Sequence, residues 1–316
     1  ARIKQRQGLE RKKRSLFYTK NLVRKRRREE EGFTEMIFTS RNSTRKLPPS
    51  TLYFQTKLLR LALANFLLAP FLVAEEAKPI GQWQFNGKSL QGKVLRPSIG
   101  SWEGNVTGTA NLTQEQPFAL EAKKGFGGIV LSQDLNQSGL PKESLSVSAW
   151  ARIDKPIQWG GILGAMQDNG NYERGWLLGY GKDSFYFAVA AEQGPKRLTY
   201  LKTKETYAPG YWYQLVGTYD GQRQRIYLDG KLSMEAKVQK GPIAYPPEGR
   251  FVIGSYWDKD EHRPMEGRLE RITLWNRALD AQEIATLFKE RKKDFPEIEP
   301  IAGPVSTKDW PTFLHD

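Results

Sequence analysis

The sequence contains no cysteine, and its only two histidines are His262 and His315. The lack of cysteine excludes disulfide bonds, zinc–thiolate centres and cysteine nucleophiles. A serine nucleophile with a histidine base would have to use His262, because His315 lies in the terminal segment, and no GxSxG motif is present. These absences argue against hydrolysis by a catalytic triad.

No apolar run is long enough to cross a bilayer comfortably, which takes roughly 20 residues. The most apolar stretch, Leu61–Ala74, follows Lys57 and Arg60 and is followed by two glutamates. This order is typical of a secretory signal peptide, so residues 57–74 are predicted as a signal peptide that is cleaved after Ala74. A buried helix and an uncleaved membrane anchor stay open as alternatives.

Positive charge is concentrated at the start of the chain. The formal net charge is +14, but 18 of the 49 basic and only 5 of the 35 acidic residues lie in residues 1–60, which leaves 31 against 30 in the rest. A basic surface for nucleic acid is therefore not predicted for the folded part. Residues 1–56 are interpreted as a basic extension that is disordered or does not belong to the mature protein.

Short β-type segments separated by turn residues dominate residues 79–295, most clearly at Trp212–Leu232. Asp-Gly dipeptides at Asp220 and Asp229 divide this stretch into three predicted strands, because Asp-Gly tolerates the positive φ of tight turns. The middle strand alternates between an inner and a wet face. The inner residues are Gln224, Ile226 and Leu228, and the outer ones are Arg223, Arg225 and Tyr227. The pattern predicts an all-β domain at 79–295.

Two further strands carry specific expectations. In Leu145–Ile153 the odd-numbered residues are apolar and should face the core, while Trp150 on the other face should be covered by a loop or a neighbouring sheet. In Gly267–Trp275 the parity of the apolar residues changes, which predicts a β-bulge near Glu270 and Arg271.

One helix is predicted after the last strand. Asp280 can cap it and Glu283 completes a capping box, while Ile284, Leu287 and Phe288 form an apolar stripe. Residues 296–316 are rich in proline at first and are predicted to be a linker with the possible start of a following domain.

The blocks SVSAWARI, GYWYQLVGTYDGQRQRIYLDGKL, FVIGSYW and EGRLERITLWNRALDAQEIATLF occur in this order along the chain. Together they resemble the laminin G-like jelly-roll family of the concanavalin A-like lectin and glucanase superfamily, in its bacterial secreted type. The resemblance implies two curved antiparallel sheets face to face, with a C-terminal helix docked at the edge. The tail DWPTFLHD resembles the opening of quinoprotein-type β-propellers.

The resemblance also bears on catalysis and on calcium. Glucanases of the superfamily use a strand-borne ExDxE or ExDxxE carboxylate set, which does not occur in this sequence, so the domain is predicted to be non-catalytic. Some relatives bind calcium, but only Gly104 and Asn105 match their DxSGNG-like first motif. Calcium is retained as a possible cofactor, and the metal ligands stay unknown.

The loop WDKDEHRPME, Trp257–Glu266, is one candidate ligand-binding segment. Tyr256 and Trp257 could stack on a sugar, while carboxylates at Asp258, Asp260 and Glu261 are hard oxygen ligands of the kind that calcium prefers. The candidate residues here are Tyr256, Trp257, Asp258 and His262. The alternative is a plain charged hairpin connection.

The second candidate segment is QDNGNYER, Gln167–Arg174. It offers Asp168, Asn169, Asn171 and Tyr172 as hydrogen-bonding partners for hydroxyl groups, although such residues are also simple turn formers. Trp159 is a candidate aromatic at the rim, whereas Trp212, Tyr219 and Trp275 fall at positions of the family framework and are predicted to be core.

The sequence therefore predicts a secreted, periplasmic or cell-surface binding module for a glycan or an extracellular protein, with no nucleic-acid partner for the folded domain and no stable membrane insertion after signal cleavage. A structural or adhesive spacer domain and a lectin-fold glycoside hydrolase remain as alternatives.

Overall fold

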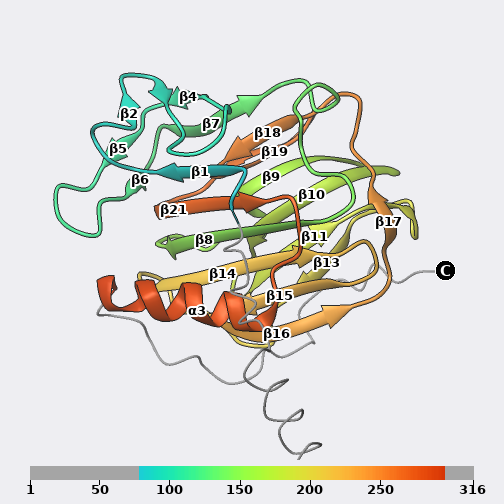
Figure 1. Ribbon diagram of the computed structural model, residues 1–316. Helices are drawn as coiled ribbons and strands as arrows, with labels where there is room; N and C mark the ends of the chain where they lie inside the picture. Colours follow the sequence, from blue (N-terminus) through green and yellow to red (C-terminus); the bar gives the residue numbers. More distant parts are fainter. Residues whose placement is uncertain (1–77, 296–316) are drawn as a thin grey trace, which may run out of the picture. The chain divides into compact units, whose positions relative to one another are not determined.

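The computed structural model describes residues 78–295. The predicted basic extension at 1–56, signal peptide at 57–74 and linker at 296–316 lie outside the described residues. Two large antiparallel sheets stack against each other, and one α-helix, α3 (Ala281–Arg291), packs outside them in the described part (Figure 1). The predicted all-β sandwich with a C-terminal helix is confirmed.

The first sheet carries the helix on its outer face. Its strands, in spatial order, are β16 (Lys231–Ala236), β15 (Gln224–Leu228), β14 (Trp212–Tyr219), β8 (Leu145–Ile153), β21 (Gly267–Trp275), β6 (Leu120–Ala122) and β5 (Asn111–Leu112), and β1 (Gly81–Gln84) also pairs with β21.

The second sheet carries the candidate site on its outer face. Its strands, in spatial order, are β13 (Thr199–Lys202), β11 (Phe185–Val189), β10 (Tyr172–Tyr180), β9 (Gly160–Asn169), β18 (Arg250–Ile253), β7 (Phe126–Ser132), β4 (Gly104–Gly108), β3 (Val94–Leu95) and β2 (Leu90–Gln91). Two small two-stranded antiparallel sheets complete the described strands: β12 (Ala191–Gln193) with β17 (Lys240–Ile243), and the hairpin of β19 (Ser255–Trp257) with β20 (His262–Pro264).

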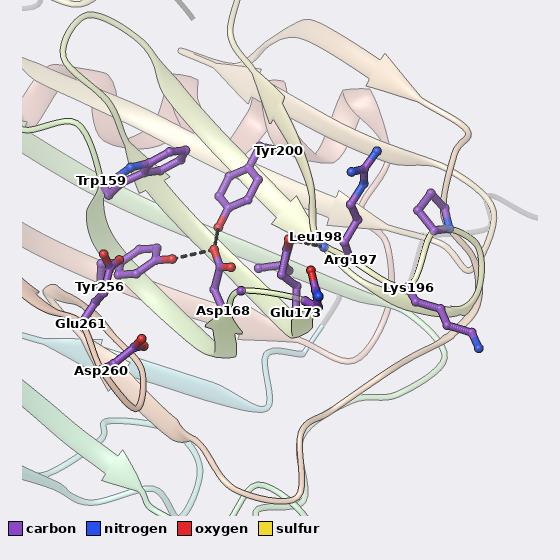
Figure 2. A pocket seen from close by; sticks show the side chains of 13 residues that line it. Trp159, Asp168, Glu173, Lys196, Arg197, Leu198, Tyr200, Tyr256, Asp260 and Glu261 are labelled. Carbon is purple, nitrogen blue, oxygen red and sulfur yellow. Dashed lines mark hydrogen bonds between the residues drawn. The ribbon is translucent and has the colours of Figure 1, made fainter. Parts of the chain in front are cut away.

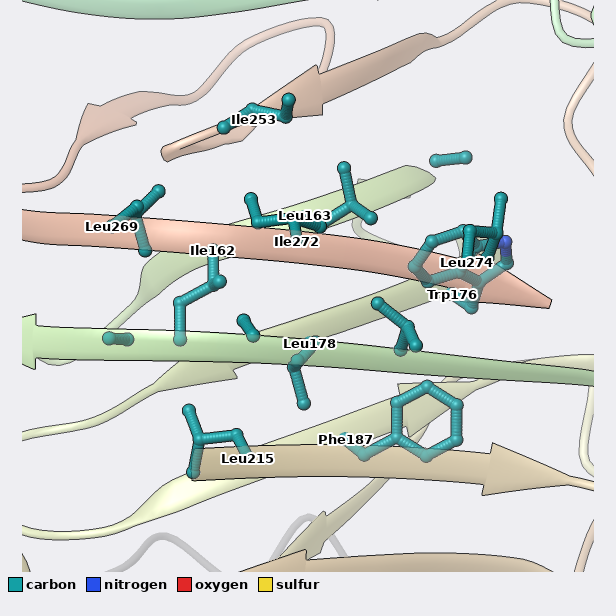
Figure 3. Packing of buried hydrophobic residues seen from close by; sticks show 14 of the residues in the cluster. Ile162, Leu163, Trp176, Leu178, Phe187, Leu215, Ile253, Leu269, Ile272 and Leu274 are labelled. Carbon is teal, nitrogen blue, oxygen red and sulfur yellow. The ribbon is translucent and has the colours of Figure 1, made fainter. Parts of the chain in front are cut away.

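The main core fills the space between the two large sheets. Leu215 and Leu274 point inward from the first sheet, and Leu178 and Phe187 meet them from the second (Figure 3). The approach is close at Gly217, because a Cβ atom there would lie 2.5 Å from the Phe187 ring. The two sheets therefore bury one continuous apolar layer, which is the main source of stability in such a sandwich.

Strand β8 follows the predicted alternation. All five of its odd-numbered side chains belong to the main core, as expected from the sequence. Trp150 faces outward and is covered by the helical segment: its ring stacks on Phe295 at a centroid distance of 4.0 Å and on Phe288 at 5.8 Å. Trp150 is therefore covered as predicted, but by α3 and the residues that follow it, not by the neighbouring sheet or a loop alone.

The inward-facing side of strand β15 is as predicted, but the side predicted to face solvent is partly covered. Gln224, Ile226 and Leu228 are buried, and Asp229 and Gly230 both have positive φ in the turn to β16. Tyr227, expected on the wet face, is only 3% exposed, because it packs with Leu279 and Ile284 under α3.

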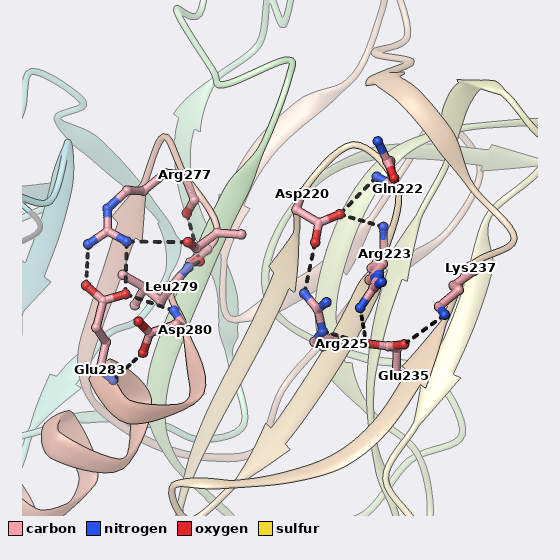
Figure 4. A network of polar contacts seen from close by, with 12 residues as sticks. Asp220, Gln222, Arg223, Arg225, Glu235, Lys237, Arg277, Leu279, Asp280 and Glu283 are labelled. Carbon is pink, nitrogen blue, oxygen red and sulfur yellow. Dashed lines mark hydrogen bonds and ion pairs between the residues drawn. The ribbon is translucent and has the colours of Figure 1, made fainter.

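The predicted β-bulge in the last strand and the predicted helix cap are both present. The register of β21 against β8 shifts between Leu269 and Ile272, which confirms the bulge. The Asp280 carboxylate accepts the amides of Gln282 and Glu283, and the Glu283 carboxylate accepts the Asp280 amide (Figure 4). This capping box, with Arg277 paired to Glu283, fixes where the chain leaves the sheet and enters α3.

Trp212, Tyr219 and Trp275 are buried, as predicted for core positions. Gln224 also links the two sheets, because its amide nitrogen donates to the carbonyl groups of Phe187 and Thr199. No helix in residues 78–295 has the length and apolar content needed to cross a membrane.

Candidate functional site

The outer face of the second sheet carries a separate apolar cluster. Met166, Leu177 and Tyr186 alternate with core residues along their strands and so point away from the main core. Tyr256 of β19 is buried over this cluster, and Trp159 packs against it. A segment before β9 and the β19–β20 hairpin therefore cover part of a face that would otherwise expose apolar side chains.

Close packing at the entry of β9 positions Trp159. A Cβ atom at Gly161 would lie 2.2 Å from the backbone carbonyl oxygen of Ser255, so only glycine lets β19 pass this close. The neighbouring Gly160 offers its carbonyl to the Tyr186 hydroxyl, at 3.0 Å. The glycines beside Trp159 thus serve strand packing, and the same packing holds the indole against the tyrosine cluster.

A pocket of about 1060 Å³ opens beside this cover. Figure 2 shows Trp159, Tyr200 and Tyr256 on one side of it, Asp168 and Glu173 at its centre, and the segment of Lys196 and Arg197 on the other side. The full lining is Trp159, Asp168, Gly170, Asn171, Glu173, Pro195, Lys196, Arg197, Leu198, Tyr200, Tyr256, Asp260 and Glu261. The pocket combines an aromatic wall with a polar floor.

The aromatic wall is built around Trp159. Its ring centroid lies 5.2 Å from that of Tyr200, 6.1 Å from Tyr186 and 6.4 Å from Tyr256, with tilted or edge-on geometry. Tyr186 and Tyr200 also meet edge to face at 5.4 Å. These arrangements are the favourable ones for aromatic pairs, so the wall is held in place before any ligand arrives.

Asp168 joins the wall to the floor. Its Oδ2 atom accepts hydrogen bonds from the hydroxyls of Tyr200, at 2.6 Å, and Tyr256, at 2.7 Å. Burial raises the pKa of both hydroxyls well above the usual tyrosine value, and the charge of Asp168 contributes, so both stay protonated donors. One carboxylate therefore orients two rings that lie 32 and 88 positions away in the sequence.

Glu173 lies directly opposite Asp168 in the β9–β10 ladder. Its Oε2 atom accepts the backbone amide of Leu198 at 2.8 Å. Burial raises the pKa of the Glu173 carboxyl, and the facing charge of Asp168 raises it further, while the Leu198 amide and Arg197 act in the opposite direction. Two acidic side chains thus share the floor of the pocket.

The structure brings together four of the sequence-predicted candidates in this pocket: Trp159, Asp168, Asn171 and Tyr256. Asn169 and Tyr172 lie instead along a smaller pocket of about 280 Å³, together with Pro247 and Lys259. The two pockets are adjacent, because Asn169 donates a hydrogen bond to Asp260, which lines the larger one.

Trp257, Asp258 and His262 do not line the larger pocket. The Trp257 ring stacks on His262 at 3.8 Å and has the Arg250 guanidinium 4.8 Å from its centroid. His262 Nε2 lies 2.6 Å from the carbonyl oxygen of Gly127. These contacts within the β19–β20 hairpin and to its neighbours occupy the aromatic and imidazole groups.

The carboxylates of the same hairpin mainly organise its turn. Asp258 Oδ1 accepts the backbone amides of Asp260, at 3.1 Å, and Glu261, at 2.7 Å, and burial raises the pKa of Asp258 to about 6. Glu261 forms an ion pair with Arg263. Within residues 78–295, no three histidine or carboxylate side chains gather as a metal site would require.

Sequence reasoning missed Glu173, Tyr186 and Tyr200. Tyr186 and Tyr200 alternate with buried core residues on β11 and β13, so strand periodicity alone could have placed them on the outer face. No sequence signal places β13 beside Asp168.

Comparison with known proteins agrees with this architecture. Residues 126–285 match a laminin G family described as "Concanavalin A-like lectin/glucanases superfamily". The chain therefore has the fold of the concanavalin A-like lectins and glucanases. More narrowly, it belongs to the laminin G-like family within that superfamily.

Individual relatives are distant. The chain is 23% identical to pappalysin-1 of Mus musculus over 162 residues and 24% identical to human pappalysin-1 over 155 residues. The matches cover 48% and 46% of this chain but only 10% of each pappalysin. Domain 4 of AbnA, an extracellular GH43 arabinanase from Geobacillus stearothermophilus solved with arabinotriose, superposes with a TM-score of 0.52 at 19% identity. The superposition covers 67% of this chain and 99% of the arabinanase domain. At this identity the likeness shows the fold alone.

Proposed function

We propose that this domain is a non-catalytic binding module that recognises carbohydrate in the pocket beside Trp159. The observation that carries the proposal is the combination of the tilted Trp159–tyrosine wall with the carboxylates of Asp168 and Glu173. Sugars present C–H groups that pack on aromatic rings and hydroxyl groups that donate to carboxylates, so this lining suits both halves of a sugar.

Pre-organisation supports the proposal. The hydroxyls of Tyr200 and Tyr256 are already bound to Asp168, so the wall does not have to be ordered when a ligand enters. Binding of a ligand then costs little conformational entropy, because these protein side chains are already ordered. The arabinanase domain with this fold was solved with arabinotriose, so an oligosaccharide is a ligand that such a sandwich can hold.

We also propose that the domain is part of a larger, secreted polypeptide. The match to pappalysin-1 covers one tenth of that protein, so we infer that the module serves a larger extracellular polypeptide. The predicted signal peptide at 57–74 and cleavage after Ala74 agree with secretion. N-terminal sequencing of secreted protein would test this, and material that begins at Ala1 would contradict it.

A glycan array with and without calcium tests the function. Trp159→Ala should abolish binding to the glycans that the parent protein binds on the array, because it removes the indole around which the aromatic wall is built. Trp257→Ala tests the alternative hairpin site and should weaken binding far less. Lys240→Ala, an exposed change on β17 outside the pocket, serves as the control.

Two results would contradict the proposal. No binding across the array would favour a spacer domain, and release of shorter sugars from a bound oligosaccharide would show a hydrolase. Calcium dependence in the array would place a metal near the ligand and would support the calcium that the sequence left open.

A further inference from the structure

The charge of the pocket indicates which class of carbohydrate it prefers, an inference that rests on the proposed carbohydrate function. Four carboxylates line it, Asp168, Glu173, Asp260 and Glu261, against two basic side chains, Lys196 and Arg197. The excess of negative charge disfavours an acidic ligand in a confined site, because like charges cost more where water is partly excluded.

Three of these four carboxylates form no ion pair within residues 78–295, although Arg197 lies close enough to act against the raised pKa of Glu173. Among the ion pairs of residues 78–295, only the one between Glu261 and Arg263 involves a carboxylate of the pocket. Within the described residues, the Asp168 carboxylate accepts the two tyrosine hydroxyls and the Glu173 carboxylate accepts a backbone amide. Hydrogen bonds of this kind orient a carboxylate but leave its charge in place.

The acids of the floor also face each other. Asp168 and Glu173 are directly opposite residues of neighbouring antiparallel strands, a position in which like charges repel. The raised pKa of Glu173 agrees with that repulsion. A cation bound between them would relieve it.

The aromatic wall stands beside these acids. Tyr200 and Tyr256 reach Asp168 with their hydroxyls, so their rings and that of Trp159 border the space next to the carboxylate. Aromatic faces attract an ammonium group through their π-electrons, most strongly where the group is partly desolvated. The carboxylates and the aromatic rings of the pocket therefore both favour a ligand that carries an ammonium group.

We propose that the preferred ligand is an oligosaccharide of amino sugars with free, protonated amines. The ammonium group would lie between the carboxylates of Asp168 and Glu173, and the sugar ring would pack on Trp159. Lys196 and Arg197, both exposed, remain at the rim. N-acetylation removes the positive charge and would abolish the preference.

Calorimetric titration with four tetrasaccharides tests this at a slightly acidic pH, where the amine is protonated. The four are a glucosamine tetramer, its N-acetylated form, a neutral glucose tetramer and a uronic acid tetramer. The glucosamine tetramer should bind with a Kd roughly tenfold lower than its N-acetylated form, which corresponds to about 1.4 kcal/mol. Added salt should reduce this advantage.

Charge-removing variants of the same shape locate the effect. Asp168→Asn and Glu173→Gln should each lose most of the advantage of the amine, measured within each variant as the ratio of the Kd of the N-acetylated tetramer to that of the glucosamine tetramer, so that a general loss of affinity cancels. Glu290→Gln, an exposed carboxylate on α3, removes the same charge outside the pocket and should retain the full advantage. Thermal unfolding of each variant confirms that it is folded.

The outcomes separate the two proposals. Equal binding of the amine and N-acetylated tetramers, lost in Trp159→Ala, would overturn the amine preference and leave carbohydrate recognition standing. Tighter binding of the uronic acid tetramer than of the glucosamine tetramer would also overturn it. If none of the tetrasaccharides binds, the amine preference fails, and the glycan array decides separately whether carbohydrate recognition stands.

Discussion

The role of Asp168 as the link between wall and floor gives the sharpest prediction. Asp168→Ala removes the only carboxylate in residues 78–295 that accepts from the Tyr200 and Tyr256 hydroxyls, and so leaves two donors without their charged acceptor. Tyr256 is only 2% exposed, so its hydroxyl cannot regain a water molecule freely. Tyr200 is partly exposed and can be rehydrated more easily.

The magnitude follows from these two bonds. A hydrogen bond to a charged acceptor contributes about 1.5–3 kcal/mol, and an unpaired buried donor keeps its full desolvation cost. The variant also removes the repulsion between Asp168 and Glu173, which offsets part of the loss. We expect the free energy of unfolding to fall by about 3 kcal/mol and oligosaccharide binding to weaken as the wall loosens.

Urea unfolding of four proteins measures this effect: the parent, Asp168→Ala, the double variant Tyr200→Phe with Tyr256→Phe, and the triple variant. In the phenylalanine background no hydroxyl is left unpaired, so Asp168→Ala should then cost less than about 1 kcal/mol. Glu290→Ala on α3 controls for the loss of one carboxylate. An equal cost of Asp168→Ala in both backgrounds would refute the reasoning, because the carboxylate would then stabilise the fold by another route.

Two further predictions concern the framework. Burial raises the pKa of Asp229 to about 6, from an ordinary value of 3.8, and the Gln214 amide offsets only part of this. The folded state therefore binds the proton more tightly, and stability from this group is lost as the pH rises through about 6. Asp229→Asn should raise the free energy of unfolding at about pH 8 by roughly 2 kcal/mol, seen as a higher melting temperature, but not at about pH 3.5, and an equal gain at both would contradict this. Asp280→Ala removes the carboxylate that accepts the amides of Gln282 and Glu283 and should lower the free energy of unfolding by about 1 kcal/mol in urea, so an unchanged midpoint would show that tertiary packing alone holds α3.

Much of the fold was predictable because its signals are local. The Asp-Gly turn at Asp229 requires positive φ, the capping box at Asp280 spans three residues, and the bulge in β21 shows as a change of parity within one strand. The exception is Tyr227, whose outward position was predicted but whose burial was not. Its burial depends on α3, more than 50 residues later in the chain.

The site was predictable only in part because its geometry is not local. Trp159, Asp168 and Tyr256 were identified as single candidates, but no sequence pattern joined them. Asp168 contacts Tyr200 because β13 returns to the sheet edge beside β11, and contacts Tyr256 because β19 crosses over the entry of β9. Strand order and the crossing of a hairpin over a sheet follow from the packing of the whole domain.

The charged hairpin at Trp257 shows why residue type alone is a weak guide to a site. Its acids and aromatics are conspicuous in the sequence, yet Asp258 accepts the amides of its own turn and Trp257 is stacked on His262. Short turns expose backbone amides that need acceptors, so acids in such turns tend to be used locally. Asp168 lies in a regular ladder in which backbone groups are already paired. Its carboxylate is therefore available to orient side chains and, by the same reasoning, to receive a ligand.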